Sequence, residues 1–355
     1  MSLQKYFKDF NDAIRLDFDV NSELSEKRDI LLKKLKNSEK LPSFNKLDQG
    51  SYAMHTGVES IDKEYDIDVA LRFNVNKDDY EPMELKNIIY DILKEHTEYG
   101  AKIKNPCVTV TYKKQGEAAY HVDLVAYTYE DKDNTNSQLY LARGKDSKPE
   151  DICWEKSDPK GLVDLINKKF DDDKEDKEQY RRVIRYIKRW KNLNFDGKGN
   201  GEPPSIAITL IAEEFLEISK EYDCLEERYK YDDLNAVLNF AKKIQSLFVY
   251  ENTQDSGRDL YRIRYYLPNE LNFESDVDLF RKMTDIQMTN FKDKIDKLVE
   301  NLEEVKEEDD EVEQCKLLNK IFGDDFKVPD KENASKKQMN YIPSSSASGV
   351  EYGHK

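Results

Sequence analysis

The chain has 355 residues, of which 37% are charged and 38% are hydrophobic, and its formal net charge at pH 7 is −16. This length is enough for two lobes, and the lack of any run of 18 apolar residues excludes a membrane-spanning helix. The acidic balance disfavours a nucleic-acid activator, because phosphate backbones attract basic surfaces. The first residues lack the apolar segment of a signal peptide, so we expect a cytoplasmic protein without a membrane partner. The four cysteines form no C-x-x-C pair, so neither a zinc ribbon nor a redox motif is indicated.

The first part of the chain predicts a long helix followed by strands. Apolar residues at three- and four-residue spacing predict one helix over residues 3–38. Residues 69–73 are predicted to lie in a strand, and the alternating residues 108–112 pair with residues 119–127 in a predicted hairpin. Between these strands, apolar residues on one face predict a helix over residues 82–96.

Beyond the hairpin the pattern becomes helical, with helices predicted over residues 159–170, 177–191, 205–218, 232–247 and 275–306. The acidic run 171–176 is interpreted as a solvated linker. The glycine-rich residues 194–201 are interpreted as a surface loop, because they follow a helix whereas a phosphate-binding loop follows a strand. Residues 298–313 are expected to form one helix with an acidic face, and the polar, serine-rich residues 331–355 a flexible tail.

Three aspartates in apolar surroundings are candidate metal ligands. Asp66 and Asp68 are two residues apart in an apolar run, so a strand points both carboxylates to one face. Such a pair repels itself and loses hydration unless a cation lies nearby. Asp123, in a second apolar run, adds a carboxylate of the kind that Mg²⁺ prefers. An isolated Asp-x-Asp in an acidic protein is more often a solvated strand edge, and Asp123 favours the metal site over that alternative.

The pair Gly50-Ser51 precedes these aspartates and is typical of a turn that opens a helix. Backbone N–H groups and a hydroxyl at such a turn can bind phosphate. By itself the pair is more often a plain helix N-cap. Its position before the aspartate pair favours a phosphate site.

The order of Gly50-Ser51, Asp66-Ile67-Asp68 and Asp123 resembles the DNA polymerase β-like nucleotidyltransferase superfamily over roughly residues 45–130. Within it the chain is most similar to the bacterial cGAS/DncV-like nucleotidyltransferases, which make cyclic oligonucleotide signals in anti-phage defence. Three further segments carry this closer resemblance to about residue 290, namely residues 154–162, 182–191 and 203–210.

The resemblance implies an α+β fold with two lobes. One is a polymerase β-like nucleotidyltransferase core, a mixed sheet with flanking helices, and the other is a helical second lobe, the two being joined by a long N-terminal helix. Residues 1–155 would form the catalytic core with that helix, and residues 156–330 the helical lobe that closes the nucleotide pocket. Residues 331–355 would form the tail.

The resemblance also implies the roles of the site residues. Asp66, Asp68 and Asp123 would be the catalytic residues and would bind two Mg²⁺ ions, with Mn²⁺ as a substitute. The nucleotide-binding residues would be Gln49, Gly50, Ser51, Lys188 and Ser205. The substrates would be NTPs, ATP or GTP or both.

Several of these assignments have simpler alternatives. Lys188 is one of six basic residues in residues 181–191, which could form a solvated face, and Ser205 follows two prolines and could be an N-cap. Some relatives have a base-stacking aromatic residue just after that serine, where this chain has Ile206. His121 shares the predicted strand face of Asp123, and we interpret it as structural because metal activation makes a general base unnecessary.

The implied function is the synthesis of a cyclic di- or trinucleotide second messenger from NTPs, with release of pyrophosphate. One alternative is a transferase of the same superfamily that makes linear oligonucleotides or modifies tRNA or protein. Another is a non-catalytic nucleotide sensor, which the three aspartates disfavour. Many relatives are conjugated through the C-terminus by ubiquitin-transfer-like proteins, so the tail is a candidate handle for a conjugation or regulatory partner, although a tail without a role is the simpler reading.

Overall fold

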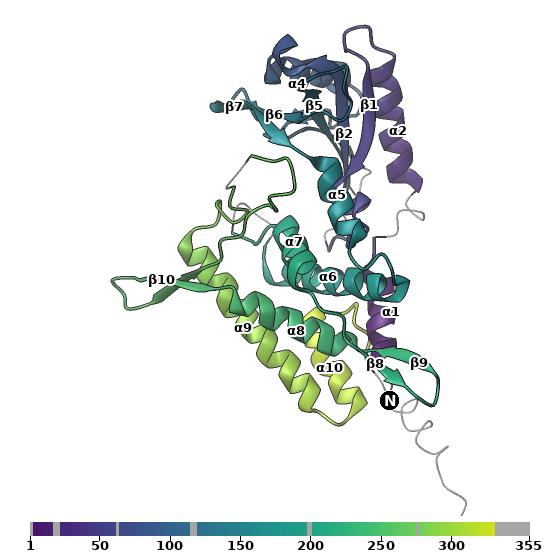
Figure 1. Ribbon diagram of the computed structural model, residues 1–355, viewed down its shortest axis with the longest axis vertical. Coiled ribbons are helices and arrows are strands. Elements are labelled where there is room, and N and C mark those ends of the chain that lie inside the picture. The colour runs from purple at the N-terminus through teal and green to yellow at the C-terminus, as the bar shows by residue number, and fades with distance from the viewer. Residues whose placement is uncertain are drawn as a thin grey trace, which may run out of the picture.

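The computed structural model describes residues 3–16, 22–61, 64–113, 119–196, 201–274 and 277–330. A sheet with its flanking helices forms one half of the molecule, and a bundle of helices forms the other (Figure 1). Each half has its own hydrophobic core, one built on the sheet and the other on the helices. None of the helices in the described ranges is long and apolar enough to cross a membrane.

The sheet is mixed and has seven strands, which are β1 (Phe44–Gln49), β2 (Glu64–Asn76), β3 (Ala101–Ile103), β4 (Val108–Lys113), β5 (Ala119–Tyr129), β6 (Leu139–Lys145) and β7 (Lys148–Ser157). Its order is β1-β2-β5-β4-β3, and β6 pairs with both β5 and β7. The central strands β2 and β5 are parallel, and the other pairs are antiparallel. The predicted strands and the β4–β5 hairpin are confirmed, whereas β1, β3 and the β6–β7 hairpin were not predicted.

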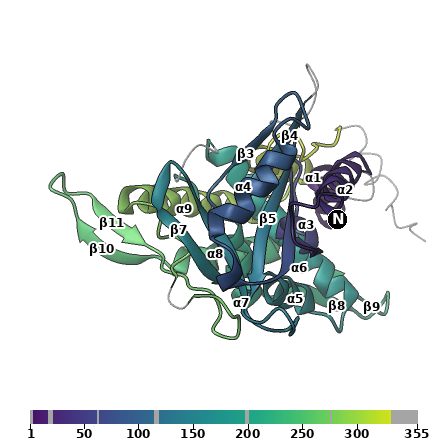
Figure 2. The same ribbon diagram turned by 90° about the horizontal axis from the view of Figure 1, so that it is seen from above.

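Two helices, α2 (Ser22–Lys36) and α4 (Pro82–Leu93), cover one face of the sheet. Their leucines and isoleucines pack with alternate residues of β2 and β5, such as Val69 and Leu124. In Figure 2, α4 lies across the strands. Because successive strand residues point to opposite faces, the intervening residues of β2 and β5 lie on the other face. That face carries Asp66, Asp68 and Asp123.

The predicted single helix over residues 3–38, which was to join the two lobes, is wrong. Helix α1 (Gln4–Ile14) ends at Arg15, whose backbone is extended and pairs with Val58. The carbonyl of Ile14 accepts the N–H of Glu59, and the N–H of Leu16 donates to the carbonyl of Gly57, so the strand-like pairing replaces helical hydrogen bonds. Helix α1 packs in the helical core and α2 packs on the sheet, so two separate helices contact the two halves.

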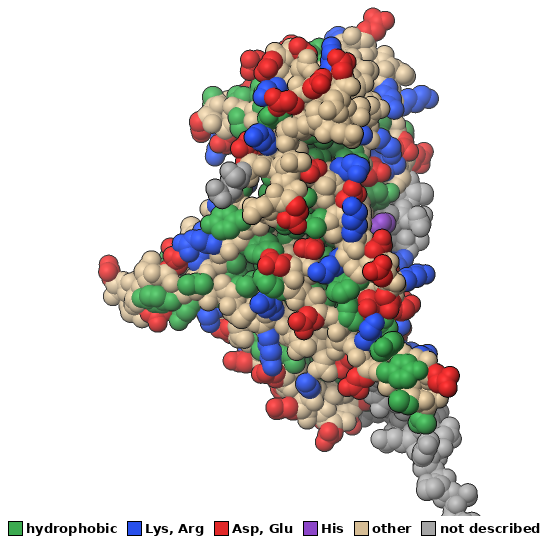
Figure 3. Space-filling view, in the orientation of Figure 1, with side chains coloured by type: hydrophobic (Ala, Val, Ile, Leu, Met, Phe, Trp, Pro, Cys, Tyr) green, Lys and Arg blue, Asp and Glu red, His purple; other side chains and the backbone are tan. Residues whose placement is uncertain are grey.

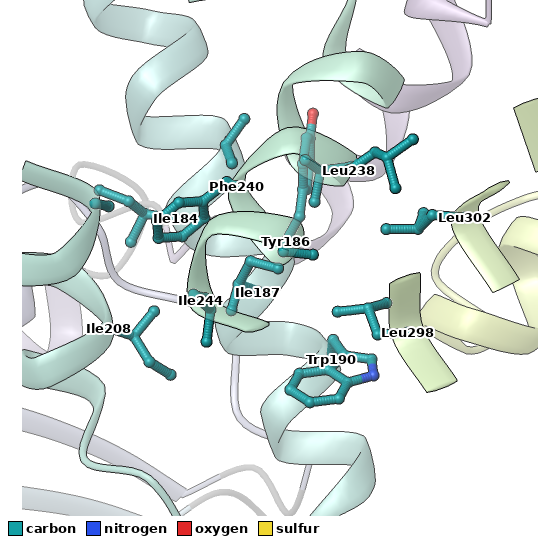
Figure 4. Packing of buried hydrophobic residues seen from close by; sticks show 14 of the residues in the cluster. Ile184, Tyr186, Ile187, Trp190, Ile208, Leu238, Phe240, Ile244, Leu298 and Leu302 are labelled. Carbon is teal, nitrogen blue, oxygen red and sulfur yellow. The ribbon is translucent and has the colours of Figure 1, made fainter. Parts of the chain in front are cut away.

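The helical half contains α5 (Pro159–Lys168), α6 (Lys174–Asn194), α7 (Ser205–Phe215), α8 (Asp233–Ser246), α9 (Asp285–Glu307) and α10 (Glu311–Phe322). Helix α6 is central, and Figure 4 shows its Tyr186, Ile187 and Trp190 among side chains of α7, α8 and α9. Two charged residues are buried here as a pair, since Arg182 Nε lies 2.7 Å from Asp233 Oδ2.

Three predicted helix boundaries need correction. The expected linker 171–176 is partly helical, because the Asp173 side chain accepts the N–H groups of Glu175 and Asp176 and so caps α6. Residues 298–313 are not one helix, because α9 ends at Glu307 and Asp310 caps α10. Helix α9 begins ten residues later than predicted, at a capping box between Thr284 and Gln287.

Short elements complete the described chain: α3 (Gly50–Ala53), a 3₁₀ turn η1 (Lys77–Asp79), and two hairpins formed by β8 (Lys220–Asp223) with β9 (Arg228–Tyr231) and by β10 (Val249–Thr253) with β11 (Asp259–Arg262). The β10–β11 hairpin projects from the body of the molecule (Figures 1 and 2). Acidic and basic side chains are mixed over the face seen in Figure 3, without a large basic patch. The predicted tail 331–355 lies outside the described residues.

Candidate active site

A row of polar side chains crosses four neighbouring strands. Gln49 of β1 is paired with Asp68 of β2, Asp68 with Asp123 of β5, and Asp123 with Thr109 of β4. The parallel pairing of β2 with β5 therefore places two of the predicted catalytic aspartates directly opposite each other. Asp66 lies two residues before Asp68, opposite His121.

Asp123 is held from two sides. Its Oδ1 accepts a hydrogen bond of 2.5 Å from Thr109 Oγ1 and lies 3.6 Å from the Nζ of Lys104. Lys104, between β3 and β4, was not identified from the sequence, because its closeness to Asp123 depends on strand order. His121 Nδ1 lies 3.1 Å from Thr111 Oγ1, which agrees with the structural role that we expect for this histidine.

The three aspartates place several carboxyl groups close together on one face of the sheet. Burial, reinforced by the charges of Asp123 and Asp66 and opposed by Lys104, raises the pKa of Asp68 to about 7. A bound cation would remove this penalty, and three carboxylates are donors that hard divalent cations accept. Within the described residues, no three His, Cys, Asp or Glu side chains are arranged as a ready metal site. The donors therefore fit a divalent cation in their chemistry, and binding would require them to move closer together.

Gly50 meets a close-packing requirement next to these aspartates. Its φ is +71°, a conformation that favours glycine. A Cβ at this position would lie 2.1 Å from Asp68 Oδ2, so no side chain fits between the turn and the carboxylate. Ser51 follows Gly50 in α3. Gln49 precedes Gly50, and the Oε1 of Gln49 accepts a 3.1 Å hydrogen bond from the hydroxyl of Tyr127.

Lys188 reaches the site from the helical half. Its side chain is buried, with 4% of its surface exposed, so the solvated-face alternative is wrong for this residue. The Nζ donates to the carbonyl oxygen of Thr56 at 3.2 Å and to its hydroxyl at 2.9 Å. Burial and the nearby charges of Lys191 and Arg185 lower the pKa of Lys188 to about 7. The sequence could not show this, since burial arises from contact between α6 and the segment after α3.

Ser205 is the first residue of α7, and Pro204 is its N-cap, so the N-cap alternative for Ser205 is wrong. Its hydroxyl accepts a 3.0 Å hydrogen bond from Lys191 Nζ, and Lys191 also lies 3.4 Å from Glu202. This serine therefore presents its hydroxyl at the helix start, next to a buried lysine.

A cavity of about 380 Å³ lies between the two halves and collects most of the predicted site. Its lining comprises Gln49, Gly50, Ser51, Met54, Asp68, Tyr127, Ser157, Pro159, Leu162, Val163, Lys188, Ser205, Ile206, Thr209 and Phe273. The cavity therefore brings together six predicted site residues, whereas Asp66 and Asp123 do not line it. Two other hollows, of about 400 and 680 Å³, lie in the helical half and contain no predicted site residue.

Several residues of this cavity were missed by sequence reasoning. Ser157 lies within a segment that carried the family resemblance, which was a usable signal. Thr209 had the same signal, because it lies within residues 203–210, whereas Tyr127 and Phe273 belong to none of the three segments that carried the closer resemblance. Thr56, which binds Lys188, likewise has no motif of its own.

Comparison with known proteins gives matches of three kinds. Residues 43–127 match the family described as "Cyclic GMP-AMP synthase DncV-like, nucleotidyltransferase domain". A cyclic GMP-AMP synthase from Escherichia albertii is 27% identical over 214 residues, which cover 58% of this chain and 43% of the relative. A c-di-GMP synthase from Roseivirga ehrenbergii is 26% identical over 196 residues, which cover 48% of each chain. The matched region thus spans about half the length of these curated relatives.

The fold is similar along almost the whole chain to that of a solved enzyme. The crystal structure of the Vibrio cholerae DncV cyclic AMP-GMP synthase superposes with a TM-score of 0.64 and 18% identity, covering 93% of this chain and 98% of that one. The predicted α+β nucleotidyltransferase architecture, a mixed sheet with flanking helices and a helical half, is therefore confirmed, apart from the continuous N-terminal helix.

Proposed function

We propose that this chain, whose residues 43–127 match the DncV-like nucleotidyltransferase family, synthesises a cyclic di- or trinucleotide second messenger from NTPs, with release of pyrophosphate, in anti-phage signalling. Both curated relatives are synthases of cyclic dinucleotides. ATP and GTP are the substrates that their names favour.

One observation carries the proposal. Asp68 lies opposite Asp123 on parallel strands, beside the Gly50 turn, and Asp68 and the buried Lys188 both line the cavity between the two halves. A cavity lined by a carboxylate with two further aspartates beside it, and also by a buried lysine, suits a metal-bound polyphosphate, because the cations and the phosphates each find a charge of opposite sign.

The proposed roles follow from these positions. Asp66, Asp68 and Asp123 would hold two Mg²⁺ ions, for which Mn²⁺ would substitute, and such ions would neutralise phosphate charge and lower the pKa of an acceptor hydroxyl. Lys188 and the hydroxyls of Ser51 and Ser205 bind the donor triphosphate. Gln49 lines the same cavity. These residues orient the donor, and positioning with charge neutralisation accounts for most of the rate enhancement in phosphoryl-type transfer.

Ring closure requires two successive transfers in the same cavity. The first joins two nucleotides, and the linear product then turns so that its remaining triphosphate faces Ser51 and Lys188. A second transfer closes a dinucleotide ring, and a trinucleotide needs one additional round. The cavity volume of about 380 Å³ lies within the range of small-molecule sites.

The test is incubation of the purified chain with four NTPs and Mg²⁺, followed by mass spectrometry and nuclease digestion of the product. We expect pyrophosphate release and a nuclease-resistant cyclic product. A linear product would instead indicate an oligonucleotide synthase. NTP binding without pyrophosphate release would indicate a sensor, and either result would overturn the proposal.

A further inference from the structure

The cavity between the two halves has a polar part and an apolar part. Its lining includes the polar residues Ser51, Asp68 and Lys188, and also an aliphatic wall made of Leu162 and Val163 of α5 with Ile206 of α7. A nucleotide has the same division, since its phosphates are charged and its base is a flat, largely apolar ring. The proposed function assigns metal and phosphate binding to the polar part of the cavity, but it assigns no ligand group to the apolar part.

Two of the residues that line the cavity have phenyl rings, Tyr127 and Phe273. Tyr127 is 4% exposed, packs in the sheet-side cluster, and donates its hydroxyl to Gln49. Its ring is therefore committed to the core. Phe273 is half-buried, and among the described residues its ring has no aromatic or cationic partner. Phe273 is thus the lining ring that a ligand can reach.

The segment that carries Phe273 is tied to the catalytic half. The carbonyl of Asn272 accepts a 3.0 Å hydrogen bond from the Nε2 of Gln138, which lies just before β6. The backbone N–H of Asn272 donates to Asp158 Oδ2 at 3.4 Å. Asp158 is also the N-cap of α5, the helix that supplies the aliphatic wall. The segment begins with buried Leu271. These contacts fix the backbone next to Phe273, whose ring lines the same cavity as Leu162 and Val163.

We propose that Phe273 is the platform on which the base of the bound NTP stacks, with the aliphatic wall on the other side of the base, and that Gln138 is a positioning residue for this platform. The inference rests on the proposed function, because it assigns the base subsite of that cavity. Stacking uses the face of the base, which all bases share, so the platform contributes affinity without choosing between bases.

The test separates base binding from phosphate binding. Equilibrium dialysis with Mg²⁺ measures two probes, α,β-methylene-ATP, which cannot release pyrophosphate, and inorganic tripolyphosphate, which has no base. Phe273→Ala should weaken binding of the nucleotide analogue about 5- to 150-fold, the range for loss of one stacked base. Its affinity for tripolyphosphate should change by less than about twofold, since the phosphate-binding residues remain.

Matched variants complete the design. Phe273→Trp should retain nucleotide affinity, Phe273→Leu should give an intermediate loss, and Lys188→Met should weaken both probes. Gln138→Ala should weaken only the nucleotide analogue, and adding it to Phe273→Ala should cause no further loss, as expected for two residues that act as one unit.

Nucleotide affinity unaffected by Phe273→Ala would overturn the proposal, as would an equal loss for both probes in a folded variant. The binding assay needs no turnover, so it tests the platform separately from cyclic nucleotide synthesis. If the wild-type chain binds the analogue through Phe273 yet makes no product, the proposed function fails while the platform stands. The unfolding temperature of each variant identifies any loss caused by misfolding.

Discussion

Asp68 and Lys188 are ionisable residues that line one cavity, and the pKa of each lies close to 7. Burial acts on both, raising the pKa of the acid and lowering that of the base, and each has neighbours of its own sign that add to the effect. Keeping such a buried side chain charged costs free energy until a ligand of opposite charge binds. At the scale of single residues, the cavity therefore offers an acidic side chain to a cation and a basic side chain to an anion.

Asp123→Asn should reduce pyrophosphate release by at least about 10³-fold, comparable to the loss of a key electrostatic group in an active site. The amide keeps the size of the side chain and can still bond to Thr109, so the unfolding temperature should stay close to that of the wild type. Asp91→Asn, at an exposed position on α4, is the matched control. Turnover near the wild-type level in Asp123→Asn would remove this residue from the proposed site.

The pH dependence of stability tests the burial of Lys188. Because its pKa falls from 10.5 to about 7 on folding, the unfolded chain holds the extra proton between these values, and the free energy of unfolding rises with pH in this window. Relative to Lys188→Met, the wild type should gain about 2–3 kcal/mol between pH values of about 7.5 and 9.5.

Urea unfolding of both proteins at the two pH values measures this gain. Lys86, whose pKa burial lowers to about 8, contributes to both proteins alike and cancels in the comparison. Lys148→Met, at an exposed position on β7, should show the same pH dependence as the wild type. The same gain in Lys188→Met would mean that this lysine is not the titrating group.

At the scale of elements, the turn from β1 into α3 and the helix α6 form the site together. The turn places Gly50 against Asp68, and α6 directs Lys188 to Thr56, just after α3. Arg185, one turn earlier in α6, donates to the side chain of Asn11 at 2.7 Å and to the carbonyl of His55 at 2.7 Å. Helix α6 therefore fixes the segment around the Gly50 turn from the helical half.

Gly50→Ala tests how closely this turn packs. Two effects are expected, strain at a φ of +71° and a clash with the Asp68 carboxylate. Gly257→Ala is the matched control, because its φ is +82° and nothing lies within 4 Å of the added Cβ. The control should cost only the strain of about 1–2 kcal/mol and keep activity.

Gly50→Ala should cost more stability than the control and lower pyrophosphate release more than about 10-fold, because Asp68 must move and a misplacement of 1 Å can cost 10²-fold. Thermal unfolding and the pyrophosphate assay measure the two effects. If both alanine variants behave alike, Asp68 is not constrained by the turn.

At the scale of the whole molecule, the end of the described chain is part of the helical core. Phe326 is fully buried, and its ring centroid lies 5.3 Å from that of Phe7 and 5.2 Å from that of Phe10. Asp325 pairs with buried Arg189 of α6 at 3.2 Å. Helix α1 and the residues after α10 are far apart in the sequence, and they pack together beside α6.

Two truncations test where the folded part ends. A chain that stops after residue 330 should retain nucleotide synthesis and stability, because residues 331–355 are polar and serine-rich. A chain that stops after residue 322 should lose about 3–5 kcal/mol, as expected for the loss of one buried phenylalanine. Loss of activity in the chain that stops after residue 330 would show that the tail packs on the two halves of the molecule. It would exclude the interpretation of the tail as a partner handle alone.

The sequence alone indicated the type of fold and most of the residues of the candidate site. Gly50-Ser51 and the pair Asp66 and Asp68 were recognisable because each is a local pattern, and a strand sends residues two apart to one face whatever surrounds it. Asp123 was recognised from its own apolar run and from the order of the three motifs along the chain. The strands that carry Asp66, Asp68 and Asp123 were predicted for the same reason. The helices of the second half followed from apolar periodicity, with errors where caps at Asp173, Thr284 and Asp310 set the true boundaries.

Only the tertiary structure decided how these parts meet. The parallel pairing of β2 with β5 put Asp68 opposite Asp123, and strand order brought Lys104 to the same carboxylate. Lys188 changed from a residue of a basic helix to a buried cation because α6 packs against the segment after α3. Arg15 ended the first helix by pairing with Val58, a partner remote in sequence. Each of these outcomes depends on contacts between distant segments, which a local pattern does not encode.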